Sequence, residues 1–362
     1  MGRTVALVGA LHPGARELAL ALEDDPAVER VLGLSRHEPP LLGPKFEFVP
    51  AAPGDARFAE SLAGVDVLVL FPLVDASDRN EEGRRARVVE ATRRSLAAAT
   101  RATTVVLWSS GVVYGAHPDN PVPIPETQPP RPNPDFPAAG VLAESEQIAL
   151  ANAGADSQGS AGRRSVAVLR GAGVWAPAWG TFLSRSLMAP AVVGVRGADP
   201  PLQCLAPADA VSALMLAVSG QLEGVYNVAP DDWVGASAAV AAAGRRRLEV
   251  PQRVALATAE RLWRAGMSAA TVGELHYHMY PWVLDNARLR AAGWAPTRSS
   301  AEAFAEAGRQ VPEGVLVGRV QVRRDQLRRG AAAGLALLAV VAVARRQVRT
   351  RRAGSGRRSA PM

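Results

Sequence analysis

Lysine and cysteine are almost absent from this chain of 362 residues, and each shortage excludes some chemistry. The one cysteine, Cys204, has no second thiol for an internal disulfide, which favours a cytoplasmic protein. We expect Cys204 to be a small buried apolar residue. The one lysine, Lys45, lies early in the chain, so no later segment has an ammonium group to tune a catalytic side chain. No signal peptide is evident, because the first residues lead directly into the apolar segment Val5–Val8.

Basic charge is concentrated at the end of the chain. The formal net charge is +7, yet residues 319–362 contain twelve arginines and a single acid, Asp325. The preceding residues, 1–318, therefore carry a small excess of acidic groups. A mildly acidic body lacks the basic face that nucleic-acid binding requires, so we expect no specific nucleic-acid partner.

The same tail contains an apolar run. Residues 330–344 carry no charge and are bounded by pairs of arginines. As a helix this run would be roughly 22 Å long, which is short of the ~30 Å hydrocarbon core of a membrane. Two interpretations compete: association with a membrane surface through residues 319–362, helped by snorkelling arginines, or an alanine-rich helix packed on a partner. We favour membrane association of a protein whose body lies in the cytoplasm.

Apolar and helical segments alternate along the body. Short apolar runs without internal alternation are typical of buried parallel strands, and the segments between several of them have helical periodicity. This alternation predicts an α/β fold with a doubly wound parallel sheet of Rossmann type. We expect residues 5–8, 67–70 and 105–108 to lie side by side at its centre. The expected organisation is a dinucleotide-binding lobe at 1–165 completed by 165–230, a smaller substrate lobe within 171–310, and the tail at 319–362.

The first strand is followed by a glycine-containing turn and a helix, which is the arrangement of dinucleotide-binding sites. Candidate cofactor-binding residues here are Gly9, Ala10, Gly14 and Ala15. Two neighbours oppose this interpretation, since His12 adds bulk where the backbone approaches phosphate and Pro13 removes an amide. A plain turn between strand and helix is an equal alternative.

The segment Ser109-Ser110-Gly-Val-Val-Tyr114-Gly115 resembles the extended short-chain dehydrogenase/reductase family, the NAD-dependent epimerases and dehydratases. Further matches are the proline-dense loop at 116–137 and the segment 165–230, and the resemblance extends over roughly residues 3 to 306. It implies that Ser110 polarises a substrate hydroxyl or carbonyl, and that Ser109 and Gly171 lie at the cofactor. The alternative is a strand end capped by serines.

The resemblance also shows what is missing. The family uses a tyrosine as general acid/base, with a lysine four residues later that lowers its pKa and holds the cofactor. The matching positions here are Ala138 and Leu142, and no lysine is available nearby. Tyr114 matches a second tyrosine of the family and Tyr226 a packed strand residue, so neither replaces the catalytic one. The proton-transfer pair is therefore absent, and Ser110 is a vestigial candidate.

The cofactor preference follows from the end of the second strand. An acid there binds the ribose of NAD, whereas this chain has Ser35 and Arg36, a combination that suits the 2′-phosphate of NADP. A solvated loop arginine is an equal alternative for Arg36. Phe71 replaces a small residue beside the cofactor, and Ala52 stands where the family has an aspartate. We therefore expect NADP or NAD to bind weakly or vestigially, with NADP preferred.

Three functions remain in competition. The first is an NAD(P)-binding protein of the epimerase/dehydratase family with impaired or altered catalysis. The second is an active oxidoreductase or epimerase that acts on a sugar-like or steroid-like alcohol through a non-standard acid/base. The third is a non-enzymatic dinucleotide sensor or membrane scaffold. A metal site is not expected, because His276 and His278 have no cysteine or acid cluster near them.

Overall fold

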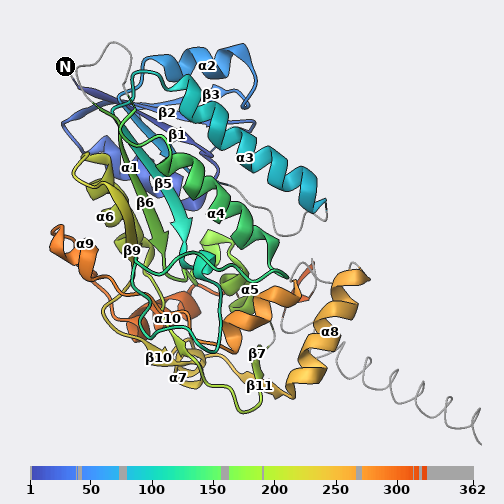
Figure 1. Cartoon of the computed structure of the whole chain (residues 1–362). Coiled ribbons are helices and arrows are strands. Elements are labelled where there is room, and N and C mark those ends of the chain that lie inside the picture. The colour runs from blue at the N-terminus through green and yellow to red at the C-terminus, as the bar shows by residue number, and fades with distance from the viewer. Residues whose placement is uncertain are drawn as a thin grey trace, which may run out of the picture. The chain divides into compact units, whose positions relative to one another are not determined.

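The computed structural model describes residues 2–37, 39, 43–72, 80–155, 163–189, 191–265, 271–312, 314–317 and 320–323. Residues 1–311 form one compact unit, and residues 312–362 form a second (Figure 1).

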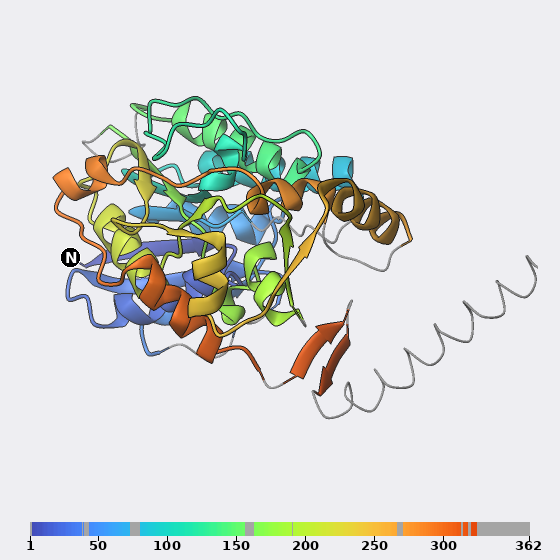
Figure 2. The same ribbon diagram turned by 90° about the horizontal axis from the view of Figure 1, so that it is seen from below.

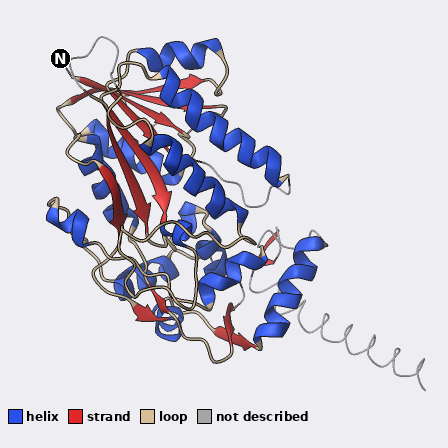
Figure 3. Ribbon diagram, viewed as in Figure 1, coloured by secondary structure: helices blue, strands red, loops and turns tan. Residues whose placement is uncertain are grey.

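A seven-stranded parallel sheet forms the centre of the first unit (Figure 3). Its order is β3-β2-β1-β4-β5-β6-β9, and all neighbouring strands pair in parallel. Because β1, β4 and β5 are consecutive, the predicted central trio is confirmed. The strands are β1 (Arg3–Val8), β2 (Val28–Ser35), β3 (Phe46–Pro50), β4 (Val67–Leu70), β5 (Thr104–Ser110), β6 (Ser165–Gly171) and β9 (Gly224–Val228).

Helices cover both faces of this sheet (Figures 1 and 2). Successive side chains of a strand point to opposite faces, and both faces here are apolar. Val5 and Leu7 pack in one cluster with α1 (Pro13–Glu23) and α6 (Pro207–Val218), and Ala6 packs in the other with α2 (Ala56–Ala63) and α3 (Glu81–Ala98). Burial on both faces explains why the strands read as continuous apolar runs rather than as alternating ones. The predicted doubly wound α/β class is confirmed.

Helix α1 begins at Pro13, since His12 caps it and proline is favoured in the first turn. The helices are α1 (Pro13–Glu23), α2 (Ala56–Ala63), α3 (Glu81–Ala98), α4 (Pro137–Leu150), α5 (Phe182–Met188), α6 (Pro207–Val218), α7 (Ala236–Ala242), α8 (Gln252–Arg264), α9 (Ala287–Ala291) and α10 (Ser300–Arg309).

Short strands outside the central sheet come before and after β9 in the chain. They form two small pairs, of which β7 (Val192–Val195) with β11 (Arg247–Val250) is parallel, and β8 (Pro201–Leu202) with β10 (Val234–Gly235) is antiparallel. Cys204 follows β8 and is 2% exposed, which confirms it as a buried apolar residue.

The second unit contains an antiparallel hairpin of β12 (Gly314–Val317) and β13 (Val320–Arg323). The apolar run at 330–344, on which the membrane prediction depends, lies outside the described residues. Within the described part of the chain, every helix is too short or too polar to cross a membrane.

Candidate functional site

The predicted site residues gather at the carboxyl edge of the sheet. Gly9 follows β1, Phe71 follows β4 and Ser110 ends β5, so all three lie at the edge where open α/β sheets bind ligands. The strand order also reverses between β1 and β4, which makes this edge a topological switch point. Gly9 and Ser110 thus share one edge of the sheet, with β4 between their strands.

The turn after β1 requires glycine at position 9. The φ angle of Gly9 is 88°, and a Cβ there would lie 2.4 Å from the carbonyl oxygen of Phe71. Ala10, Gly14 and Ala15 are buried, so the start of α1 packs tightly beneath the turn. The sequence pattern therefore corresponds to a real close approach between β1, β4 and α1.

His12 occupies the N-terminus of α1. Its Nδ1 accepts the backbone N–H of Gly14 at 3.0 Å, so the amide that would face a phosphate already has a partner inside the chain. Burial lowers the pKa of His12 to about 4, so the ring is neutral at pH 7 and Nδ1 remains an acceptor. The sequence predicted a bulky side chain at position 12. The structure shows that this side chain also caps helix α1.

His12 belongs to a chain of four rings in contact, which we call the aromatic wall: Phe71, His12, Trp179 and Trp108. His12 stacks on Phe71 with ring centroids 5.1 Å apart, and Trp179 meets His12 edge-on at 5.5 Å. Trp108 meets Trp179 edge-on at 6.0 Å. The wall thus crosses the carboxyl edge from the end of β4 to the end of β5.

A large cavity of about 1050 Å³ lies at the β1–β2 side of this edge. We call it the arginine pocket. Gly9, Ser35, Arg36, Ala52 and Phe71 line it, and α3 contributes a series of arginines along one side, namely Arg84, Arg87, Arg93 and Arg94. The Ser35 hydroxyl donates to the backbone carbonyl of His37. The predicted Ser35–Arg36 pair therefore lies in a pocket with further cations that the sequence argument missed.

A second cavity, of about 300 Å³, lies at the β5–β6 side of the same edge. We call it the aromatic pocket. Its lining is mainly apolar and aromatic, with a few polar side chains. It includes His12, Trp108, Ser109, Ser110, Phe136, Ala138, Leu142, Gly171, Trp179, Thr181, Phe182 and Arg185.

Ser110 and the two substituted positions meet in the aromatic pocket. Ala138 and Leu142 lie one turn apart on α4, and both line the pocket together with Ser110. The Ser110 hydroxyl makes two long contacts, 3.5 Å to the Gly171 carbonyl oxygen and 3.4 Å from the Val112 amide nitrogen. The three positions that the resemblance places together therefore do meet in one pocket, but two of them carry apolar side chains.

Ser109 belongs instead to a buried polar network. Its hydroxyl donates to Glu146 on α4, and Glu146 pairs with Arg170 at 2.6 Å. The Arg170 guanidinium carbon lies 4.7 Å from the ring centre of Tyr114, whose hydroxyl donates to Asn227. This network was not predicted. Arg170 stands out as a charged residue in the apolar strand β6, but nothing local in the sequence connects it to Glu146.

No replacement base lines the aromatic pocket in the part of the chain that the structure describes. Tyr114 is buried beneath it, and burial raises the pKa of its phenol, with Arg170 opposing that shift. The amino group of Lys45 donates to the Asp25 carbonyl, away from the lining residues of the pocket. His12 has a lowered pKa and an engaged Nδ1, which makes it a poor base.

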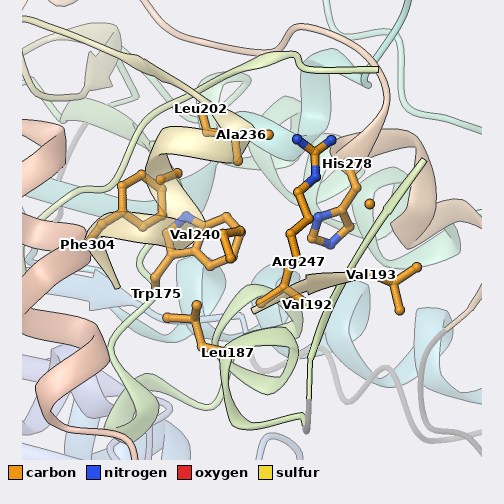
Figure 4. Close-up of a pocket in the computed structure, with 12 residues that line it drawn as sticks. Trp175, Leu187, Val192, Val193, Leu202, Ala236, Val240, Arg247, His278 and Phe304 are labelled. Carbon is orange, nitrogen blue, oxygen red and sulfur yellow. The ribbon is translucent and has the colours of Figure 1, made fainter. Parts of the chain in front are cut away.

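The two histidines considered for a metal have different partners. His276 contacts Asp135 at 2.9 Å, and His278 meets Trp175 edge-on. His278 also lines a small cavity of about 10 Å³ with Arg247, as Figure 4 shows. A space of that size holds about one water molecule, which is too little for a substrate.

Comparison with protein families and curated sequences gives few matches. No family model matches the chain. Uncharacterised proteins of Mycobacterium bovis and Mycobacterium tuberculosis are 32% identical over 204 residues, which is 55% of this chain and 52% of theirs. The chain thus spans about half the length of these curated relatives.

Solved structures are similar over most of the chain. MoeE5 in complex with UDP-glucuronic acid and NAD is 20% identical, with a TM-score of 0.64 over 85% of this chain and 99% of that one. DesIV, a dTDP-glucose 4,6-dehydratase from Streptomyces venezuelae, is 20% identical with a TM-score of 0.64 over 85% and 96%. A UDP-galactose 4-epimerase is 19% identical with a TM-score of 0.60 over 85% and 98%. The chain has the fold of the extended short-chain dehydrogenase/reductase family, as its motifs predicted.

Proposed function

We propose that this chain is an NAD(P)-binding protein of the epimerase/dehydratase type in which the family's alcohol chemistry is impaired. The observation that carries the proposal is the lining of the aromatic pocket, where Ala138 and Leu142 stand beside Ser110. MoeE5 and DesIV share this fold and have been solved with NAD, which supports a dinucleotide as the ligand of the edge. The division of residues 1–311 into a Rossmann lobe and a substrate lobe remains a prediction.

The impairment follows from proton transfer. Oxidation of an alcohol requires a group that takes the hydroxyl proton, and such assistance is typically worth about 10²–10⁴ in rate. The Ser110 hydroxyl has neither a tyrosine nor a lysine in the described lining of the pocket to activate it. Ser110 is therefore suited to hold a ligand oxygen rather than to act as the base.

The arginine pocket fits a phosphorylated adenosine better than the turn at α1 fits a pyrophosphate. Arg36 and the arginines of α3 supply cations along the pocket. The Gly14 amide, in contrast, is bonded to His12, so the pyrophosphate loses a donor unless that ring moves. Binding that is weak, and stronger for NADP than for NAD, is the result that this arrangement supports.

Calorimetric titration of the purified full chain tests this proposal. We expect NADP to bind at least about 5-fold more tightly than NAD, because a charge-assisted bond to the 2′-phosphate contributes about 1.5–3 kcal/mol. Arg36→Gln is expected to remove the difference. Arg101→Gln, an exposed arginine in the turn before β5, is the matched control and should leave it unchanged. Tighter binding of NAD would contradict the preference, and no heat with either dinucleotide would contradict dinucleotide binding.

Attachment of the tail to membranes is a separate expectation from the sequence. Removing residues 324–362 leaves the β12–β13 hairpin intact and deletes the apolar run with its flanking arginines. We expect the full chain to sediment with membranes and the shortened chain to stay in the supernatant. A second variant separates apolar burial from charge. Replacing Leu335, Leu337 and Leu338 by serine in the full chain should also release the protein from membranes, because apolar burial is lost while the arginines are kept. A full chain found in the supernatant without detergent would favour the partner-helix alternative.

A further inference from the structure

The polar side chains of the aromatic pocket differ in the hydrogen bonds that they already make within the protein. The Ser109 hydroxyl donates to Glu146 inside the buried network. The Thr181 hydroxyl donates to the Val174 carbonyl at 2.8 Å and accepts the Ser184 amide at 3.1 Å, as the cap of α5. Within the residues that the structure describes, the side-chain contacts of Ser110 and Arg185 are 3.3 Å or longer, so these two side chains have more capacity left for a ligand than Ser109 or Thr181.

Arg185 is held loosely at the pocket. Its Nη2 lies 3.3 and 3.5 Å from the two carboxylate oxygens of Glu274, and its Nη1 lies 3.5 Å from the Gly180 carbonyl oxygen. Burial raises the pKa of Glu274 to about 7, with Arg185 opposing that shift, so this partner is only partly ionised near neutral pH. The side chain of Arg185 is 28% exposed. A guanidinium with five donors and such long bonds can take a second carboxylate in bidentate geometry.

The lining of the aromatic pocket is rich in aromatic rings. Trp108 meets Trp179 edge-on with ring centroids 6.0 Å apart, and Phe136 meets Phe182 edge-on with centroids 5.4 Å apart. Leu142 extends the apolar lining at a position where the family has a cation. A sugar nucleotide would expose many hydroxyls to these walls, and each unpaired polar group costs about 1–3 kcal/mol. A planar aromatic body gains from the same walls instead.

From this arrangement we infer that the aromatic pocket binds a flat aromatic carboxylate, with its rings between the aromatic side chains and its carboxylate on Arg185. Ser110 would accept or donate one hydrogen bond to a polar substituent of the rings. The volume of about 300 Å³ is at the small end for ligand sites and suits a ligand of two fused rings. The inference uses the site named under the proposed function and specifies its ligand class, which differs from the nucleotide sugars bound by MoeE5.

The test uses the purified full chain without dinucleotide and three probes: 2-naphthoate, the neutral 2-naphthalenemethanol, and UDP-glucose. By calorimetry we expect naphthoate to bind about 10-fold or more tightly than the alcohol, because of the charge-assisted bonds to Arg185, and UDP-glucose to give no heat. Arg185→Gln should abolish the preference for naphthoate and leave the affinity for the alcohol within about 2-fold. Arg253→Gln on α8, which is exposed and outside the lining, is the matched control.

A second variant tests the walls independently of the charge. Leu142→Gln keeps the size of the side chain but places an amide in the apolar lining, so both naphthyl probes should bind several-fold more weakly. Equal affinity for naphthoate and the alcohol in the unsubstituted chain, or tighter binding of UDP-glucose than of either, would overturn the inference. NADP is titrated into a separate sample as well. Heat with NADP but no preference for naphthoate would reject the inference on the aromatic pocket and leave the proposed dinucleotide binding in place.

Discussion

Replacing Glu146 by alanine is expected to lower the free energy of unfolding by about 3–5 kcal/mol. Glu146 and Arg170 are 1% and 3% exposed, and the substitution would leave the guanidinium buried without its carboxylate. The hydroxyl of Ser109 would lose its acceptor in the same step. Urea unfolding followed by tryptophan fluorescence measures the loss.

Two controls separate the buried charge from the contact itself. Replacing both Glu146 and Arg170 by methionine removes the pair together, and we expect the double variant to be more stable than Glu146→Ala, because a buried pair can often be exchanged for apolar side chains at little cost. Glu47→Ala removes an exposed ion pair with Arg30 and should cost at most about 1 kcal/mol. A Glu146→Ala loss as small as that of Glu47→Ala would contradict the described network.

Replacing His12 by glycine is expected to tighten NADP binding about 10-fold to 100-fold. The substitution frees the Gly14 amide and removes the ring that stacks on Phe71, and these contacts together account for about 1–3 kcal/mol that a pyrophosphate must otherwise displace. Glycine is itself accepted at a helix N-cap at a cost of a few tenths of a kcal/mol, so α1 should remain folded. Calorimetry with NADP measures the change.

His12→Asn is the matched contrast. Asparagine removes the stacked ring but can still accept the Gly14 amide, so the gain in affinity should be smaller than with glycine. The two variants thus divide the effect between the occupied amide and the steric bulk. Unchanged NADP affinity in both variants would show that His12 does not obstruct the cofactor.

The core of the fold could be predicted from sequence because local patterns determine it. Continuous apolar runs such as Val67–Leu70 are typical of strands buried on both faces, and the register later showed both faces covered. The start of α1 cannot be read from the apolar periodicity, because that periodicity begins only after the first turn. Helix caps depend on single side chains such as His12, which a periodic pattern does not reveal.

The site was predictable only where a motif carried it. The resemblance directed attention to Ser110, Ala138 and Leu142, and the structure brings all three to one pocket. The pairing of Glu146 with Arg170 joins residues 24 apart in the chain and depends on how α4 packs on the sheet, so no local signal fixed it. The arginines of α3 were not predicted as part of the site, because a helix rich in charged residues usually faces solvent.

The central claim is a dinucleotide fold whose acid/base has been lost, and an assay of hydride transfer tests it most directly. The full chain is incubated with NADP or NAD and a panel of alcohols that includes UDP-glucose and a steroid alcohol, and reduced cofactor is followed by its absorbance. The account predicts no turnover above the background without protein, and no change in that background on Ser110→Ala. Robust oxidation that disappears on Ser110→Ala would show that a different base has been recruited, and it would contradict the account.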